Sequence, residues 1–222
     1  MDNSHEVERG VVSRRRVADH GEVLTGKREV DAMLALVAQE VERIDSRFLE
    51  PACGTGNFLA EILTRKLFVV RGRYATNQRD YELHAIEAIG SLYGIDILLD
   101  NILSCRQRLL EILCSEHVAT FQCAPRRELS AAARYVVHRN IIWGDALRCM
   151  TLGAAAEPIV FSEWSCGDGD SIKRRDYSFK SLIDQGGTEN KVVRADRGDN
   201  RENPQPLKEH ESVSISQLGE GT

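Results

Sequence analysis

The sequence has no apolar run long enough to cross a membrane, which would need about 20 consecutive apolar residues. Its first residues, Met1-Asp-Asn-Ser-His5, also lack the charged and then apolar segments of a secretory signal peptide. These two absences predict a cytoplasmic protein with no membrane partner.

An excess of basic residues is absent as well. The chain has 29 lysines and arginines against 34 aspartates and glutamates, which gives a formal net charge of −5. A protein that binds nucleic acid by itself usually has a basic surface and a high isoelectric point. The charge therefore argues against a stand-alone nucleic-acid-binding protein, but it leaves open DNA contact through a partner or through a local basic face.

Paired cysteines are also missing. No two of the 6 cysteines form a Cys-x-x-Cys pair, so the spacing predicts neither a zinc site nor a disulfide framework, and we expect no bound metal. We interpret most of them as small apolar residues in a reducing compartment. They are Cys53, Cys105, Cys114, Cys123, Cys149 and Cys166.

What is present favours a single α/β domain, because 222 residues suffice to bury a substantial core. We expect a flexible N-terminus over 1–18, an ordered domain over 19–183, and a polar tail over 184–222 that is disordered because it has few apolar residues to bury. The stretch 123–134, which contains Pro125, is expected to be irregular. Apolar spacing predicts helices over 27–43, 57–70, 80–90 and 99–115, and strands over 46–50, 91–97, 139–147, 158–164 and 173–179.

The most informative segment is Phe48-Leu-Glu-Pro-Ala-Cys-Gly-Thr-Gly-Asn-Phe-Leu59. An apolar strand ends in a carboxylate, passes through a Gly-x-Gly turn and continues as an amphipathic helix from Asn57. The two glycines allow a positive φ and a close approach of the backbone to a ligand, and the helix N-terminus offers unpaired N–H groups. This arrangement predicts a site for a nucleotide-like ligand at the carboxyl end of the strand.

The string Glu50-Pro-Ala-Cys-Gly-Thr-Gly-Asn-Phe58 resembles the S-adenosylmethionine-binding loop of the amino-methylating DNA methyltransferases, in particular the adenine-N6 group of restriction–modification systems. Tyr93-Gly-Ile-Asp96 is similar to the second motif of that family, and Asn140-Ile-Ile-Trp-Gly-Asp-Ala-Leu147 is similar to the third. His20-Gly-Glu-Val-Leu-Thr25 is similar to the N-terminal motif that contacts the cofactor, although Gly26 stands where a proline normally follows the threonine.

The resemblance implies an α/β, Rossmann-like doubly wound class I methyltransferase fold that is incomplete, with only the first half of the sheet. It implies S-adenosyl-L-methionine as the cofactor. The residues that it places in the cofactor site are Thr25, Glu50, Pro51, Ala52, Cys53, Gly54, Gly56, Asn57, Phe58, Asp96, Ile97, Asp145 and Ala146.

Acidic residues lie at the ends of three predicted strands, and each suits one part of this cofactor. Glu50 would face the methionine ammonium, and Asp96 could accept both ribose hydroxyls, because a carboxylate accepts two donors. Asp145 could accept from the adenine amino group, with Ala146 offering a backbone N–H to a ring nitrogen; alternatively, Asp145 only caps the next helix. Phe58 could pack on the adenosine or enter the core.

A dinucleotide cofactor fits this loop less well. The dinucleotide fingerprint requires a third glycine and an acid roughly 20 residues further on. Leu59 occupies the position of the third glycine, and Asp96 follows at about twice that spacing.

The sequence has no Pro-Pro pair, whereas adenine-N6 methyltransferases carry an Asn/Asp-Pro-Pro-aromatic loop that holds the flipped adenine. No catalytic residue is therefore predicted in this chain. We expect a second polypeptide to supply that loop and the target-recognition domain, and DNA to be contacted through it. The first strand, central in the complete fold, would then be an open edge that favours association.

Two other functions remain open. The chain could be a non-catalytic cofactor-binding remnant or regulatory subunit of a restriction–modification system. It could also be a small-molecule or protein methyltransferase with the same loop and a different acceptor site.

Overall fold

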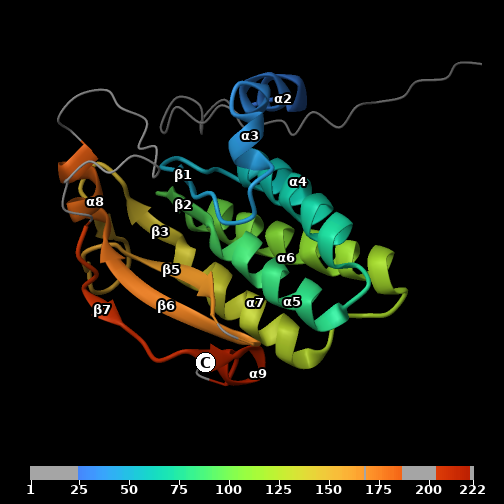
Figure 1. The fold of residues 1–222 in the computed structure, drawn as a ribbon. Helices are drawn as coiled ribbons and strands as arrows, with labels where there is room; N and C mark the ends of the chain where they lie inside the picture. Colours follow the sequence, from blue (N-terminus) through green and yellow to red (C-terminus); the bar gives the residue numbers. More distant parts are fainter. Residues whose placement is uncertain (1–24, 168, 187–203, 221–222) are drawn as a thin grey trace, which may run out of the picture.

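The computed structural model describes residues 25–167, 169–186 and 204–220. These residues form a mixed α/β protein with a four-stranded, largely parallel sheet and a small antiparallel sheet (Figure 1). The helices are α2 Lys27–Ala35, α3 Ala38–Val41, α4 Asn57–Tyr74, α5 Gln78–Gly90, α6 Leu99–Phe121, α7 Arg127–Asn140, α8 Phe179–Gly186 and α9 Ile215–Leu218. The strands are β1 Phe48–Glu50, β2 Leu92–Asp96, β3 Ile141–Asp145, β4 Met150–Thr151, β5 Val160–Cys166, β6 Ser171–Ser178, β7 Lys208–Glu209 and β8 Val213–Ser214.

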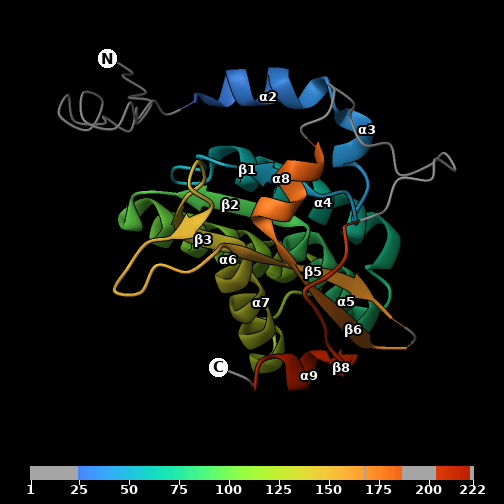
Figure 2. The same ribbon diagram turned by 90° about the vertical axis from the view of Figure 1, so that its left-hand side faces the viewer.

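The larger sheet has the strand order β1-β2-β3-β4, in which β1, β2 and β3 are parallel and β4 is antiparallel to β3. Two helices connect β1 to β2, and two more connect β2 to β3. All four, α4 to α7, lie on the same side of the parallel strands (Figures 1 and 2). Strand β1 pairs only with β2 within the described residues, so it forms an edge of the sheet.

The other side of the parallel strands is covered by β5 and the start of α8. Alternate residues of β2 point to opposite faces: Leu92 joins the core under the helices, whereas Tyr93 and Ile95 join a second core cluster. In that second cluster the Phe161 ring packs against those of Tyr93 and Phe179, at centroid distances of 5.1 and 5.4 Å. Strand β2 is therefore buried on both faces, by helices on one side and by β5 and the start of α8 on the other.

The second sheet is built on the β5–β6 hairpin, with β7 and β8 paired to β6. Residues 204–220 follow the hairpin and end in α9, which lies beside α7 (Figure 2). Ile215 and Leu218 of α9 are buried in the main core. The prediction of a disordered tail is therefore wrong for 204–220, because a few apolar residues and hydrogen bonds to β6 hold this polar segment in place.

Two helical segments also differ from the predictions. The helix expected over 27–43 is interrupted at Leu36 and Val37, where backbone N–H groups bond to carbonyls three residues earlier. The interruption leaves Val37 exposed and turns Val41 into the core. The stretch predicted to be irregular forms the start of α7, which buries apolar residues at helical spacing: Leu129, Ala132, Ala133, Val136 and Val137.

The segment 1–18, predicted to be flexible, lies outside the described residues, as do most residues of the His20–Thr25 motif. Within the ranges described, no helix combines the length and the apolar character that crossing a membrane requires.

Candidate cofactor-binding site

The loop after β1 forms a tight turn between the strand and α4. The Cys53 N–H donates to the Ile95 carbonyl of β2 at 2.9 Å, and the Gly56 N–H donates to the Cys53 carbonyl at 2.8 Å. Gly56 has φ +84°, a left-handed conformation that favours glycine, and α4 begins at the next residue. The sequence prediction of a strand, a glycine turn and a helix from Asn57 is confirmed.

Asp96, the last residue of β2, joins this loop to the start of α6. One carboxylate oxygen accepts from the Gly54 N–H at 2.8 Å, and the other accepts from the Leu98 N–H at 2.8 Å and from the Asn101 amide at 3.3 Å. Two carboxylate oxygens offer about four acceptor positions. Asp96 therefore fixes the shape of the loop and retains limited capacity for a ligand hydroxyl.

A cavity of about 80 Å³ opens at the loop and is bordered by Glu50 at the end of β1. Burial raises the pKa of the Glu50 carboxyl group, although a backbone hydrogen bond from Ala52 opposes that shift. Glu50 makes no ion pair within the described part of the chain. A half-buried carboxylate of this kind favours a cationic ligand group over a phosphate.

Asn57, the first residue of α4, connects the loop to two other segments. Its amide donates to the Thr25 carbonyl at 2.9 Å, and its side-chain oxygen accepts from the Arg108 guanidinium at 2.6 Å. Arg108 lies on α6 and was not predicted as a site residue, since no local pattern connects positions 51 residues apart.

Cys53 is buried against β2. A methyl group at Gly94 would come within 3.0 Å of its sulfur atom, so the glycine of β2 makes room for the thiol. The neighbouring Cys105 thiol and burial raise the pKa of Cys53, which keeps the thiol protonated and poorly nucleophilic. Cys53 therefore serves as a packing residue of the loop.

The residues predicted to hold the adenosine lie along the ends of β2 and β3. Asp145 accepts from the backbone N–H groups of Leu147 at 2.9 Å and Arg148 at 3.1 Å, so it caps the turn after β3, where the structure has no helix. Ile97 is 46% exposed, and its carbonyl accepts from the Trp143 indole at 3.0 Å. Ala146 packs against the second core cluster.

The structure therefore brings together only part of the predicted site. Seven of the predicted residues border the cavity: Thr25, Glu50, Ala52, Cys53, Gly54, Asn57 and Phe58. Thr55, which was not predicted, borders it as well. Pro51, Gly56, Asp96, Ile97, Asp145 and Ala146 do not border it. A cavity of this size is smaller than the roughly 300 Å³ of a typical small-molecule site, so it accounts for one end of a cofactor at most.

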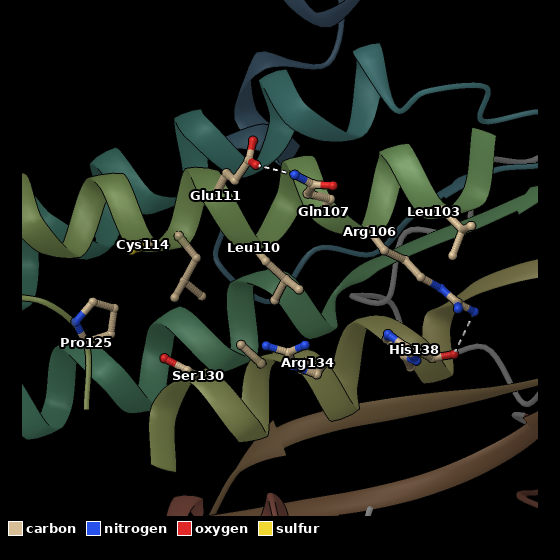
Figure 3. A pocket seen from close by; sticks show the side chains of 12 residues that line it. Leu103, Arg106, Gln107, Leu110, Glu111, Cys114, Pro125, Ser130, Arg134 and His138 are labelled. Carbon is tan, nitrogen blue, oxygen red and sulfur yellow. Dashed lines mark hydrogen bonds between the residues drawn. The ribbon is translucent and has the colours of Figure 1, made fainter. Parts of the chain in front are cut away.

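A larger and more open cavity, of about 460 Å³, lies between α6 and α7 (Figure 3). Arg106, Arg134 and His138 line it, with leucines of α6 along its length. The Arg106 guanidinium donates to the Ile141 carbonyl at 2.6 Å and to the His138 carbonyl at 3.3 Å, which ties α6 to the start of β3. None of the residues predicted from the sequence borders this cavity.

Comparisons with protein-family models, with curated proteins and with solved structures found no match to this chain.

Proposed function

We propose that this chain binds S-adenosyl-L-methionine as part of a DNA adenine-N6 methyltransferase of restriction–modification type that acts in the cytoplasm. Its β1-β2-β3 sheet would be the first half of a doubly wound class I methyltransferase fold. One observation carries the proposal. Glu50, Asp96 and Asp145 end three adjacent parallel strands, and the Asp96 carboxylate holds the glycine loop by the Gly54 N–H.

The negative charge of these three carboxylates, at the carboxyl ends of the parallel strands, supports a cationic cofactor. S-adenosyl-L-methionine carries a sulfonium and an ammonium group, and a carboxylate near them is favourable. Glu50 would accept from the ammonium, and Asp96 would accept from the ribose with its remaining acceptor capacity. Exposed Ile97 would cover the adenine beside Asp145.

Methyl transfer requires little covalent help from the protein. The cofactor supplies an activated methyl group, and the site aligns the sulfonium with the attacking nitrogen. The residues that would hold the adenine nitrogen are not found in this sequence, which has no Pro-Pro pair. In this proposal a second polypeptide supplies the Asn-Pro-Pro-aromatic loop and the contacts to DNA, and the open edge of β1 is where it would continue the sheet.

Cofactor titration by calorimetry, followed by a methylation assay, tests the proposal. We expect saturable binding of S-adenosyl-L-methionine at one equivalent. Glu50→Gln should weaken that binding about 10- to 100-fold, because it removes one charge-assisted hydrogen bond of about 1.5–3 kcal/mol while retaining the size of the side chain. Glu111→Gln removes the same charge on α6, beside the larger cavity, and should bind like the wild type.

Absence of binding by the wild type, or equal binding by both variants, would contradict the cofactor assignment. Transfer of labelled methyl groups to DNA is expected only when a polypeptide with an Asn-Pro-Pro-aromatic loop is added. Cofactor binding without transfer to DNA under any such condition would favour a non-catalytic subunit, and transfer to a small molecule or a protein would favour a different acceptor.

A further inference from the structure

Three side chains with metal-binding atoms meet where the end of β5 lies against α5. His84 and Glu87 are three residues apart on α5, a spacing that places them on one face of the helix. Cys166 is the last residue of β5. The imidazole nitrogen, carboxylate oxygen and thiol sulfur that they offer all lie within 4.8 Å of one another.

This cluster is separate from the cofactor loop. The loop follows the carboxyl end of β1, whereas Glu87 lies in the last turn of α5, just before the amino end of the parallel strand β2. The site therefore does not depend on the proposed function, and it lies towards the amino ends of the parallel strands, whereas the loop lies at their carboxyl ends.

The donor set selects the class of metal. Nitrogen, sulfur and carboxylate oxygen together are the ligands of Zn²⁺ and related transition-metal ions. Calcium and magnesium take oxygen ligands, so a thiol and an imidazole disfavour them. Three protein ligands leave a fourth tetrahedral position for water or another ligand.

The surroundings of His84 fit a metal ligand. Its Nδ1 lies 2.8 Å from the Asp80 carbonyl oxygen. A carbonyl can only accept, so in the neutral ring Nδ1 carries the proton and Nε2 has the free lone pair. The Tyr74 ring stacks on the imidazole at 3.9 Å with an angle of 11° between the planes, which restrains the ring. A backbone carbonyl that orients the second nitrogen is typical of metal-bound histidines.

Glu87 provides the negative charge. It is half-buried, and it makes no ion pair within the residues that the structure describes. Its Oε1 accepts from the Cys166 backbone N–H at 3.3 Å, which holds the end of β5 against α5. A carboxylate that is removed from solvent without a cationic partner is costly, and a bound cation would compensate it.

We propose that His84, Glu87 and Cys166 bind a zinc-class divalent cation that fixes the β5–β6 hairpin to α5. This site was not predicted from the sequence, where the absence of a Cys-x-x-Cys pair argued against zinc. Glu87 and Cys166 are 79 residues apart along the chain.

Cobalt titration of the full chain after treatment with a chelator tests the proposal. One equivalent of Co²⁺ should produce the visible bands of a tetrahedral site and a thiolate-to-metal charge-transfer band in the near ultraviolet, and one equivalent of Zn²⁺ should abolish them. Cys166→Ser should lose the charge-transfer band. Cys123→Ser, which changes an exposed cysteine, should retain it.

His84→Ala provides a second variant if Cys166→Ser does not fold, as judged by circular dichroism. It keeps the thiol but should weaken Co²⁺ binding at least tenfold. The proposal is overturned if the wild type shows no charge-transfer band, if the band persists in Cys166→Ser, or if folded His84→Ala binds Co²⁺ as tightly as the wild type.

Discussion

Lys66 shows what a single buried side chain contributes to the position of the loop. It lies on α4 with 0% exposure. Its ammonium group donates to the Ile44 carbonyl at 2.9 Å, to the Ser46 carbonyl and to the Ser91 hydroxyl at 2.7 Å. Ile44 and Ser46 precede β1, and Ser91 precedes β2. Lys66 therefore ties α4, the helix after the loop, to the starts of β1 and β2, the two strands that hold the loop.

Burial lowers the pKa of Lys66 to about 7, which predicts a dependence of stability on pH. A lysine in the unfolded chain has a pKa of about 10.4. Between these values the unfolded state binds one more proton, so the free energy of unfolding rises with pH, by up to about 1.4 kcal/mol per pH unit. In Lys66→Met this contribution should be absent.

Urea unfolding at pH 7, 8 and 9 measures how steeply the free energy of unfolding rises with pH in the wild type and in Lys66→Met. The difference between wild type and variant is decisive, because other groups that titrate in this range affect both proteins alike. Equal slopes would show that Lys66 is not the titrating group.

At the scale of elements, the glycine turn depends on two separate constraints. Gly56 has φ +84°, and a methyl group there would come within 2.6 Å of the Cys105 sulfur atom. Gly54 has φ +52°, but a methyl group there would meet nothing within 4 Å. The two positions therefore separate backbone strain from steric overlap.

We expect Gly56→Ala to lower the free energy of unfolding by about 2–5 kcal/mol, from strain and overpacking together. Gly54→Ala should cost about 1–2 kcal/mol, from strain alone. Denaturant unfolding measures both variants. If their costs are equal, the contact with Cys105 does not constrain the loop.

The segment 204–220 is held to β6 through Asp176. This carboxylate accepts from Arg174 at 2.6 and 2.7 Å, from the Ser162 hydroxyl at 2.7 Å and from the His210 ring at 2.9 Å. Burial raises its pKa, but the bonds from Arg174, Ser162 and His210 outweigh burial and lower the pKa to about 2. The network therefore stabilises the segment at neutral pH, and this stabilisation is lost as the pH falls from about 4 towards 2.

The apolar contacts of α9 give a direct test of this docking. Leu218 is 6% exposed and Leu207, in the same segment, is 62% exposed. Leu218→Ala should lower the free energy of unfolding by about 2–5 kcal/mol, because it opens a cavity in the core. Leu207→Ala should change it by less than about 0.5 kcal/mol. Similar, small effects of both substitutions would contradict the docking of α9 on α7.

At the scale of the whole molecule, the open edge of β1 predicts association. The Phe48 N–H donates to the Ser91 carbonyl, so the backbone groups of Phe48 face β2 and those of the next residue, Leu49, face away from it. Leu49 is 47% exposed. An apolar edge with unpaired backbone groups is a site for pairing with another chain.

Sedimentation velocity of the isolated chain should show association that increases with protein concentration. Leu49→Lys should reduce it, because charged side chains on an edge strand oppose pairing. Leu36→Lys places the same charge on an exposed position of the segment between α2 and α3 and should leave association unchanged. A monodisperse monomeric wild type would contradict this prediction.

Prediction from the sequence succeeded where the signal was local. The strand, glycine turn and helix over 48–74 follow from an apolar run, two glycines and helical spacing. Prediction failed at 127–134, where Pro125 was interpreted as a break although it stands just before the start of α7. It also failed at 204–220, since the few apolar residues of that segment become buried only when α7 and β6 lie beside them.

Local sequence patterns account for the strand, turn and helix of the glycine loop and for the acids at the ends of β1, β2 and β3, because apolar periodicity and turn chemistry act over a few residues. Three other features depend on how distant parts of the chain pack together: Arg108 holds Asn57, Asp96 holds Gly54, and His84, Glu87 and Cys166 meet. These contacts join residues 42 to 79 positions apart, as well as neighbours on one helix. They arise from the packing of α4 to α7 and β5 on the sheet, and no local sequence pattern encodes that packing.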